Sequence, residues 1–219
     1  MENRSSHIPT GFIETVPPRP GSKEWYSLNS CSNVFVVESA NGHLNVSKVK
    51  NACENKLKIS SGTLFGLDQG EWGGQLVFIP DDTTKKSIVI KNGNMKFLFI
   101  FKDKIYFIEG LAHMSVSKGA LYELDITNNN FDYKKIIDFE DSPEAFTICH
   151  NKLFIASHRC FYVLENFEKK ILFKDTFWDS LYPSSIAVID EQNVFVGIRG
   201  GIAKLDLTKQ SLEFYKNTN

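Results

Sequence analysis

The chain has 219 residues and a formal net charge of −1, with 42% hydrophobic, 13% aromatic and 23% charged residues. This balance excludes an intrinsically disordered chain, and the near-neutral charge gives no electrostatic reason to expect a nucleic-acid partner. The 18 phenylalanines and 7 tyrosines favour β-structure, because aromatic rings pack well on a pleated face.

The first 33 residues differ in character from the rest of the chain. They are polar, lack periodicity and contain Pro9, Pro17, Pro18 and Pro20, which predicts an N-terminal arm over residues 1–33. An N-terminal strand that joins the last sheet is the alternative. The arm has no apolar core of signal-peptide length, and no segment approaches the roughly 20 apolar residues of a membrane span. We therefore expect a cytoplasmic protein with no membrane partner.

Residues 34–219 contain a repeated pattern and are predicted to form one domain. The apolar segment TLFGL leads through the turn-rich DQGEWGG to a second apolar segment, QLVFI, and the same arrangement recurs three times. With Leu76, Leu121, Phe161 and Ile202 as equivalent positions, the repeats are 45, 40 and 41 residues apart. Repeats of this length, built from short strands, are typical of propeller blades.

The predicted fold class is therefore all-β, a small β-propeller-like ring or arc of about four antiparallel four-stranded blades. An open arc of blades and a curved β-sandwich fit the pattern as alternatives to a closed ring. The middle strands of the repeats are expected at residues 63–67, 75–79, 105–108, 120–124, 153–156, 161–164, 194–197 and 202–205.

Two resemblances accompany this pattern. Residues 152–164 and 193–205 resemble the middle strands of blades in sugar-, lactone- and protein-binding propellers, although the chain lacks the signatures of WD40 and kelch repeats. The segment GLDQGEWGG, with the irregular repeats around it, is similar to immunity proteins of bacterial contact-dependent inhibition and polymorphic toxin systems. That second resemblance implies a stoichiometric inhibitor of a toxin and assigns no residue a role.

Neither the cysteines nor the histidines form a recognisable metal-binding motif. The four cysteines, Cys31, Cys53, Cys149 and Cys160, have neither a CxxC pair nor zinc-finger spacing, so we expect their thiols to be free. We also expect no cofactor. A three-ligand metal site is an alternative, because His113 and His158 fall on one predicted face with Asp68 or Glu71.

Propeller geometry predicts one face for a partner. In each blade, the link between the second and third strands emerges on the same face as the link to the next blade. These links carry the acidic and aromatic residues Asp68, Glu71, Trp72, Asp141, Glu144, Trp178, Asp179 and Tyr182. An acidic surface with aromatic anchors suits a basic protein partner. Trp72 lies beside glycines, so its indole either projects freely or covers the end of the core.

The sequence thus predicts a non-catalytic protein-binding module, specifically an immunity protein that covers the active site of a cognate basic toxin nuclease. The runner-up is a small propeller hydrolase or lactonase with a sugar-like substrate. It would use a carboxylate pair such as Asp68 with Glu71, or Asp141 with Glu144. A scaffold or carbohydrate-binding module is the third hypothesis.

Overall fold

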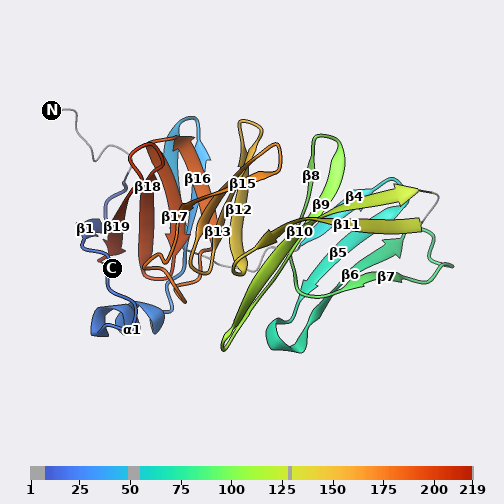
Figure 1. Cartoon of the computed structure of the whole chain (residues 1–219), viewed down its shortest axis with the longest axis horizontal. Coiled ribbons are helices and arrows are strands. Elements are labelled where there is room, and N and C mark those ends of the chain that lie inside the picture. Colours follow the sequence, from blue (N-terminus) through green and yellow to red (C-terminus); the bar gives the residue numbers. More distant parts are fainter. Residues whose placement is uncertain (1–7, 49–54, 128–129, 219) are drawn as a thin grey trace. The chain divides into compact units, whose positions relative to one another are not determined.

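The computed structural model describes residues 8–48, 55–127 and 130–218, and it is all-β apart from short helical segments (Figure 1). Contacts within the chain group it into two compact units, which we describe separately: unit 1 (residues 1–51 and 144–219) and unit 2 (residues 52–143). The expected single domain over residues 34–219 stays a prediction. No helix among the described residues is long and apolar enough to cross a membrane.

Part of the predicted N-terminal arm is a structured portion of unit 1. Strand β1 (Phe12–Thr15) pairs antiparallel with β19 (Ser211–Asn217), so the alternative of an N-terminal strand that joins the last sheet is confirmed. Helix α1 (Lys23–Asn29) begins after Ser22, whose hydroxyl accepts the Trp25 N–H at 3.2 Å. This contact satisfies one of the free N–H groups at the helix start. The helix buries Trp25 and Leu28 in the core of unit 1.

Unit 2 contains two four-stranded antiparallel sheets, each with its strands in chain order. The first comprises β4 (Lys56–Ile59), β5 (Gly62–Asp68), β6 (Gly74–Pro80) and β7 (Ile88–Asn92). The second comprises β8 (Met95–Phe101), β9 (Lys104–His113), β10 (Val116–Thr127) and β11 (Asn130–Phe139). Their apolar faces share a core formed by Leu64, Leu76, Phe78, Met95, Phe107 and Leu124. This packing explains why Leu76 and Phe78 alternate with outward residues on β6, and why Leu64 of β5 is buried beside them.

Unit 1 contains one sheet of four strands, one of five, and a hairpin. The four-stranded sheet comprises β12 (Pro143–Cys149), β13 (Lys152–Ser157), β14 (Phe161–Glu165) and β15 (Glu168–Phe173). The five-stranded sheet has the order β1–β19–β18–β17–β16, with β16 at Ser185–Asp190, β17 at Asn193–Ile198 and β18 at Gly201–Asp206. The hairpin joins β2 (Phe35–Ala40) to β3 (His43–Lys48) through Asn41 and Gly42, both at positive φ.

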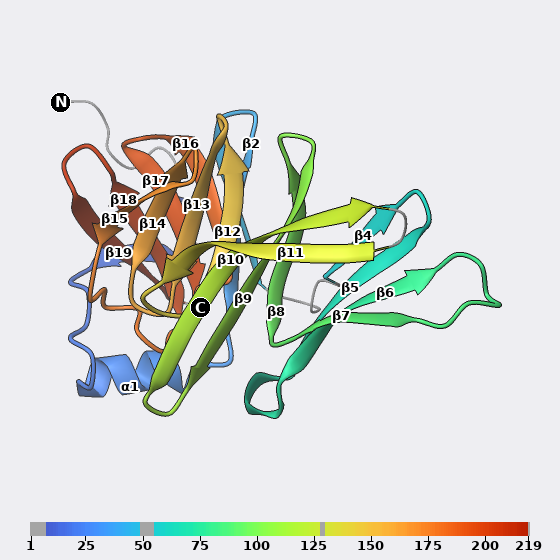
Figure 2. The same cartoon turned by 45° about the vertical axis from the view of Figure 1, so that its right-hand side comes forward.

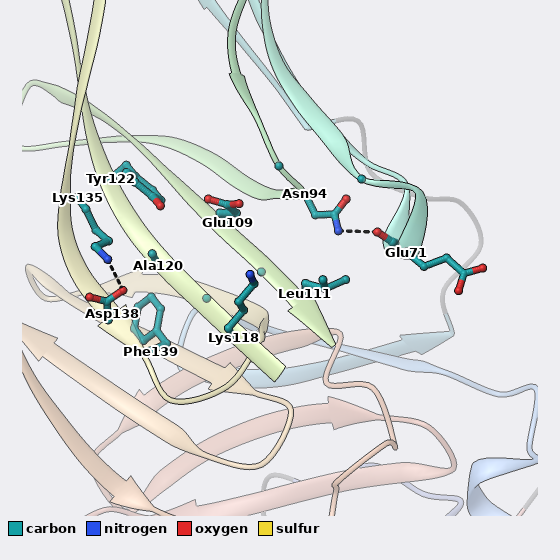
Figure 3. Close-up of a pocket in the computed structure, with 15 residues that line it drawn as sticks. Glu71, Asn94, Glu109, Leu111, Lys118, Ala120, Tyr122, Lys135, Asp138 and Phe139 are labelled. Carbon is teal, nitrogen blue, oxygen red and sulfur yellow. Dashed lines mark hydrogen bonds and ion pairs between the residues drawn. The ribbon is translucent and has the colours of Figure 1, made fainter. Parts of the chain in front are cut away.

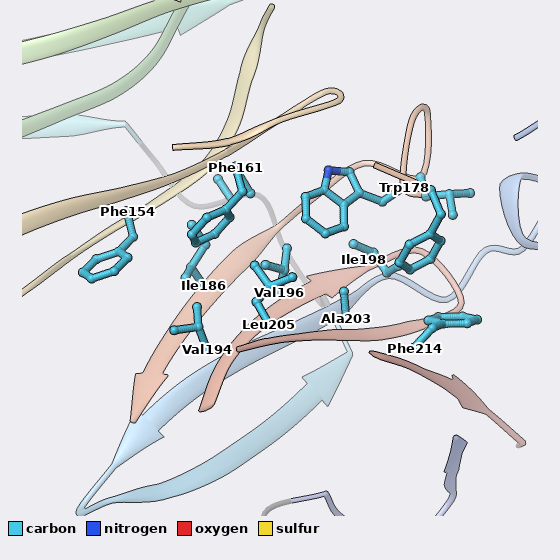
Figure 4. Close-up of a cluster of buried hydrophobic side chains, with 14 of the residues drawn as sticks. Phe154, Phe161, Trp178, Ile186, Val194, Val196, Ile198, Ala203, Leu205 and Phe214 are labelled. Carbon is cyan, nitrogen blue, oxygen red and sulfur yellow. The ribbon is translucent and has the colours of Figure 1, made fainter. Parts of the chain in front are cut away.

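The five-stranded sheet is covered on both faces. On one face, Val194, Val196 and Ile198 of β17 belong to the large core of unit 1, which Figure 4 shows in close-up. On the other face, Phe195 of β17 packs in a separate cluster with Val37 of the hairpin. A strand buried on both faces is expected to be apolar at nearly every position, as the sequence NVFVGI is.

A recurring irregularity in the sheets supports the predicted equivalence of the repeats. In three sheets, the register between the third and fourth strands shifts by one residue immediately after Leu76, Leu121 and Phe161. A β-bulge gives such a shift by inserting one extra residue in one strand. The fourth equivalent position, Ile202, continues in regular register with β19. Three of the four sheets therefore share a bulge at the position that the repeat spacing identified.

The all-β prediction is confirmed, and all eight predicted middle strands occur as antiparallel strands. None of the described sheets closes on itself. The finer prediction of a propeller-like ring or arc is therefore not established by the sheet topology.

The two tryptophans of the predicted partner face should differ sharply in their effect on stability. Trp178 is fully buried and its indole N–H donates to Ser157 O at 3.1 Å. Because Trp178→Ala leaves a cavity and an unpaired carbonyl, we expect it to lower the free energy of unfolding by about 3–5 kcal/mol. Trp72→Ala should change it by less than about 0.5 kcal/mol, because Trp72 is exposed. Urea unfolding measures both, and equal losses would contradict this assignment.

Candidate functional site

The loop that carries Trp72 links β5 to β6 in unit 2. It contains a single turn of 3₁₀-helix (Gly70–Trp72), and both Gly70 and Gly73 adopt positive φ, at 59° and 90°. Glycine adopts such angles without the steric penalty of a β-carbon, so these residues let the chain reverse tightly. Trp72 projects from the turn with 83% of its surface exposed. Of the two interpretations of Trp72, the structure therefore supports the projecting indole rather than the core plug.

A buried asparagine holds this loop in place. The side-chain amide of Asn94 donates to Gly70 O at 2.6 Å, and its Oδ1 accepts the Gln69 N–H at 3.3 Å. Asn94 O also accepts the Gly110 N–H at 3.1 Å, which ties the same residue to β9. Asp68 adds a further bond, because its Oδ1 accepts the Gly70 N–H at 2.9 Å. The turn is thus fixed by hydrogen bonds at both its start and its core-facing side.

An ion pair connects the loop to the tip of the β9–β10 hairpin. Glu71 Oε2 lies 3.2 Å from His113 Nε2, and Figure 2 shows the β5–β6 loop and the hairpin tip at the same end of unit 2. Beyond His113, Met114 is 93% exposed and adopts a φ of 52°. This left-handed conformation is uncommon for a bulky residue. We name Glu71, Trp72, His113, Met114 and Val116 the Trp72 surface.

A cavity of about 400 Å³ lies beside the Trp72 surface within unit 2 (Figure 3). Trp72 does not line it, whereas Glu71 does. Gly70 and Gly73 of the same loop also line it, and the other lining residues come from the β7–β8 link and from β9, β10 and β11. They include Asn94, Glu109, Leu111, Lys118, Tyr122, Lys135, Asp138 and Phe139.

Ion pairs balance most of the charge around this cavity. Lys91 Nζ lies 2.6 Å from Glu109 Oε2 and 4.9 Å from the ring centroid of Tyr122. Lys135 Nζ lies 2.7 Å from Asp138 Oδ1. Burial, followed by the charge of Glu109, raises the pKa of Tyr122 to about 12. Tyr122 therefore keeps its proton at neutral pH and acts as a hydroxyl donor rather than as a base.

The eight residues predicted for the partner face are divided between the two units. Unit 2 contains Asp68, Glu71, Trp72 and Asp141, whereas unit 1 contains Glu144, Trp178, Asp179 and Tyr182. The structure brings together Asp68, Glu71 and Trp72 on one loop. Asp141 and Trp178 are both buried, so neither side chain offers a surface to a partner. The prediction that these two residues contact a partner is therefore wrong, because both belong to the interior.

The remaining residues in unit 1 form local contacts. Asp179 Oδ1 lies 3.0 Å from His158 Nε2, and the Arg199 guanidinium stacks on the exposed ring of Tyr182 at 4.4 Å. Glu144 is half-buried in β12. In unit 2, Asp68 likewise pairs with Lys96 at 2.9 Å. Several carboxylates of the predicted acidic face therefore have basic neighbours, which lowers the negative potential that the sequence predicted.

The alternative metal site is not formed by the residues that the structure describes. They contain no cluster of three or more histidine, cysteine or acidic side chains. His113 and His158 each lie beside a single carboxylate, and the two histidines belong to different units.

The cysteines show no motif either. Cys31 and Cys149 are free thiols, and burial raises the pKa of the Cys149 thiol. Cys160 is buried, and Cys53 lies outside the described residues.

No protein-family model and no curated protein matches the chain. The site must therefore be interpreted from its own geometry. Sequence reasoning placed His113 on one face with Glu71, but only as a candidate metal ligand. It missed Asn94 as a support of the Trp72 surface and Met114 as a member of it. The only signal for Met114 was its place in the long link between the second and third strands of the second repeat.

Removal of the Asn94 side chain should loosen the Trp72 loop. We expect Asn94→Ala to lower the free energy of unfolding by roughly 1–3 kcal/mol, because the buried side chain loses its hydrogen bonds to Gly70 O and the Gln69 N–H. Amide hydrogen exchange should become faster at residues 69–73. The control is Asn92→Ala, which removes an exposed side chain bonded to Gln75 at 3.2 Å and should cost less than about 0.5 kcal/mol. Unchanged exchange in the Asn94 variant would show that the loop is held by other contacts.

Proposed function

We propose that this protein is a non-catalytic binding module that captures a protein partner on the Trp72 surface. The observation that carries the proposal is the exposed indole of Trp72, on a loop fixed by the buried side chain of Asn94. Tryptophan is the residue type most enriched among energetic hot spots at protein interfaces. The two glycines and Asn94 set its direction before any partner arrives.

Rigidity and apolar area both favour binding at this surface. An ordered loop pays little entropy when a partner immobilises it, so more of the contact energy appears as affinity. Met114 supplies a second exposed apolar side chain at the neighbouring hairpin tip, and methionine adapts its shape to a partner. The Glu71–His113 pair connects the two tips.

In its specific form, the proposal is a cytoplasmic immunity protein that covers the active site of a cognate basic toxin nuclease. Glu71 supports a basic partner, because its carboxylate lies on the Trp72 surface with 44% of the side chain exposed. We also propose that the four consecutive sheets are blades of a propeller-like arc, with the Trp72 loop in the position of a link between the second and third strands. The recurring bulge supports equivalent blades.

The hydrolase alternative has less support from the cavity. Glu109 and Asp138 are the carboxylates best placed for acid–base chemistry, yet a lysine ammonium lies within 2.7 Å of each. Each carboxylate is thus engaged by an ammonium group, whereas a glycosidase directs a pair of carboxylates at the scissile bond. The raised pKa of Tyr122 also removes it as a base at neutral pH. Binding therefore explains the site better than hydrolysis.

Trp72→Ala should weaken partner capture by roughly 30-fold or more, which corresponds to about 2 kcal/mol for a buried hot spot. The measurement is isothermal titration against a basic toxin nuclease domain chosen from the genes that neighbour the gene for this chain, with nuclease inhibition assayed in parallel. Tyr26→Ala is the matched control, because Tyr26 is also an exposed aromatic residue but lies in unit 1. The proposal fails if the wild-type chain does not inhibit the nuclease, or if the two variants bind equally well.

Charge reversal at Glu71 should act mainly on association. Glu71→Lys removes a negative charge from the surface and adds a positive one, so we expect the association rate with a basic partner to fall and its salt dependence to weaken. Glu71→Gln is the control, because it also breaks the pair with His113 but adds no positive charge. Stopped-flow measurements at several ionic strengths separate the effects. An equal association rate for both variants would argue against a basic partner.

A further inference from the structure

The cavity of unit 2 lies over one small residue of the β8–β11 sheet. Cross-strand pairing places Ala120 of β10 between Glu109 of β9 and Asp138 of β11, so the three side chains form one row on the same face. Because the methyl group of Ala120 is much shorter than its two neighbours, the row is low at its centre. Lys118 and Tyr122, two residues away along β10 in either direction, also line the cavity and bound it along the strand.

The opposite wall of this cavity is main chain rather than side chain. Gly70 and Gly73 of the Trp72 loop and Gly93 of the β7–β8 link belong to the lining. A Cβ built on Gly93 would lie 2.2 Å from Oε1 of Glu109, so a side chain there would collide with this carboxylate. At the end nearest the core, the ring of Tyr122 stacks on that of Phe107 with 4.8 Å between centroids. The cavity thus has a main-chain wall, a floor of side chains and an aromatic end.

Charges of opposite sign balance around the cavity. Three carboxylates and three lysine ammonium groups lie in its lining or directly behind it: Glu71, Glu109, Asp138, Lys91, Lys118 and Lys135. Glu109 pairs with Lys91 at 2.6 Å and Asp138 pairs with Lys135 at 2.7 Å. Glu71 lies at the rim, where its carboxylate contacts His113, whereas Lys118 points into the cavity (Figure 3). The site therefore offers donors and acceptors together, with no net charge to attract an ion.

Paired charges of this kind select a neutral ligand that is rich in hydroxyl groups. An ion would have to compete with a partner that is already in contact with each carboxylate. A hydroxyl group both donates and accepts, so it can join a carboxylate–ammonium pair without separating it. The hydroxyl of Tyr122 keeps its proton, because burial and the charge of Glu109 raise its pKa, and it adds a donor. Leu111 and Ala120 supply apolar contact for the carbon atoms of such a ligand.

We propose that this cavity binds a neutral sugar of one or two rings and does not hydrolyse it. Its volume of about 400 Å³ lies toward the small end of the range for small-molecule sites. The polar groups of the floor come from neighbouring strands about 4.8 Å apart, so the ligand needs hydroxyl groups around a ring rather than one polar end. Neither Ala120 nor Asp138 belongs to the Trp72 surface, so the inference goes beyond the proposed function and is tested separately from it.

Nuclear magnetic resonance titration of the full chain, labelled with ¹⁵N, tests the site with glucose, galactose, N-acetylglucosamine and maltose. At least one sugar should shift the amide resonances of residues 109–111 and 118–120, with a dissociation constant of roughly millimolar order for so small a ligand. Ala120→Leu should raise that constant at least about tenfold, because the larger side chain occupies the cavity. Ala112→Leu is the matched control, since Ala112 of β9 is not in the lining, and it should change the constant by less than about twofold.

A second pair of variants keeps the test valid if urea unfolding shows that Ala120→Leu is not folded. Lys118→Ala removes an exposed ammonium group that points into the cavity, and it should weaken sugar binding at least about threefold through a lost hydrogen bond. Lys134→Ala is its control, because Lys134 is exposed on β11 but does not line the cavity. It should leave the affinity within about twofold of the wild-type value.

Charged probes and salt test whether the ligand is neutral. Sugar binding should change less than about twofold between about 50 and 500 mM sodium chloride, whereas binding of an ion would weaken. The proposal is overturned if none of the four sugars shifts these amides at about 50 mM, or if inorganic phosphate or glycine shifts them more than any sugar does. It is equally overturned if each cavity variant that folds binds sugar as well as its control. Trp72→Ala should leave sugar affinity unchanged, because Trp72 does not line the cavity, so failure here is distinct from failure of partner capture.

Discussion

The fold depends on one constraint: some strands are apolar on both faces, so a sheet that contains such a strand needs a cover on each side. In β17, Val194, Val196 and Ile198 require one packed layer, while Phe195 requires another. The β2–β3 hairpin supplies the second layer, which gives this N-terminal segment a structural role in unit 1. In β5, Leu64 is buried within unit 2, whereas Phe65 and Leu67 lie on the other face of the sheet, where Leu67 is exposed.

The local pattern of the sequence was enough to predict the strands and their equivalence. Alternation, polar turns and the spacing of Leu76, Leu121, Phe161 and Ile202 depend on neighbours in the chain, and the structure repeats a bulge after the first three of them. The N-terminal segment was harder to interpret, because its strand and helix are stabilised by distant residues. The β1 strand exists through its pairing with β19, and Trp25 is buried by contacts made across the sequence.

The candidate site shows where such reasoning fails in physical terms. Trp72 and Trp178 both occur in links between strands, yet one is exposed and the other fully buried. The difference comes from long-range contacts: Trp178 donates to Ser157 O, 21 residues away, and packs with residues of both sheets in unit 1. Charge behaves in the same way. Asp68, Glu71 and Asp179 are unpaired in the sequence pattern, but each has a basic neighbour in the folded chain.

A single buried amide connects the architecture to the proposed function. Asn94 follows the bend between β7 and β8, so it is positioned by both sheets of unit 2, and its side chain fixes the turn from which Trp72 projects. The packing of the two sheets thus determines the direction of an exposed aromatic anchor.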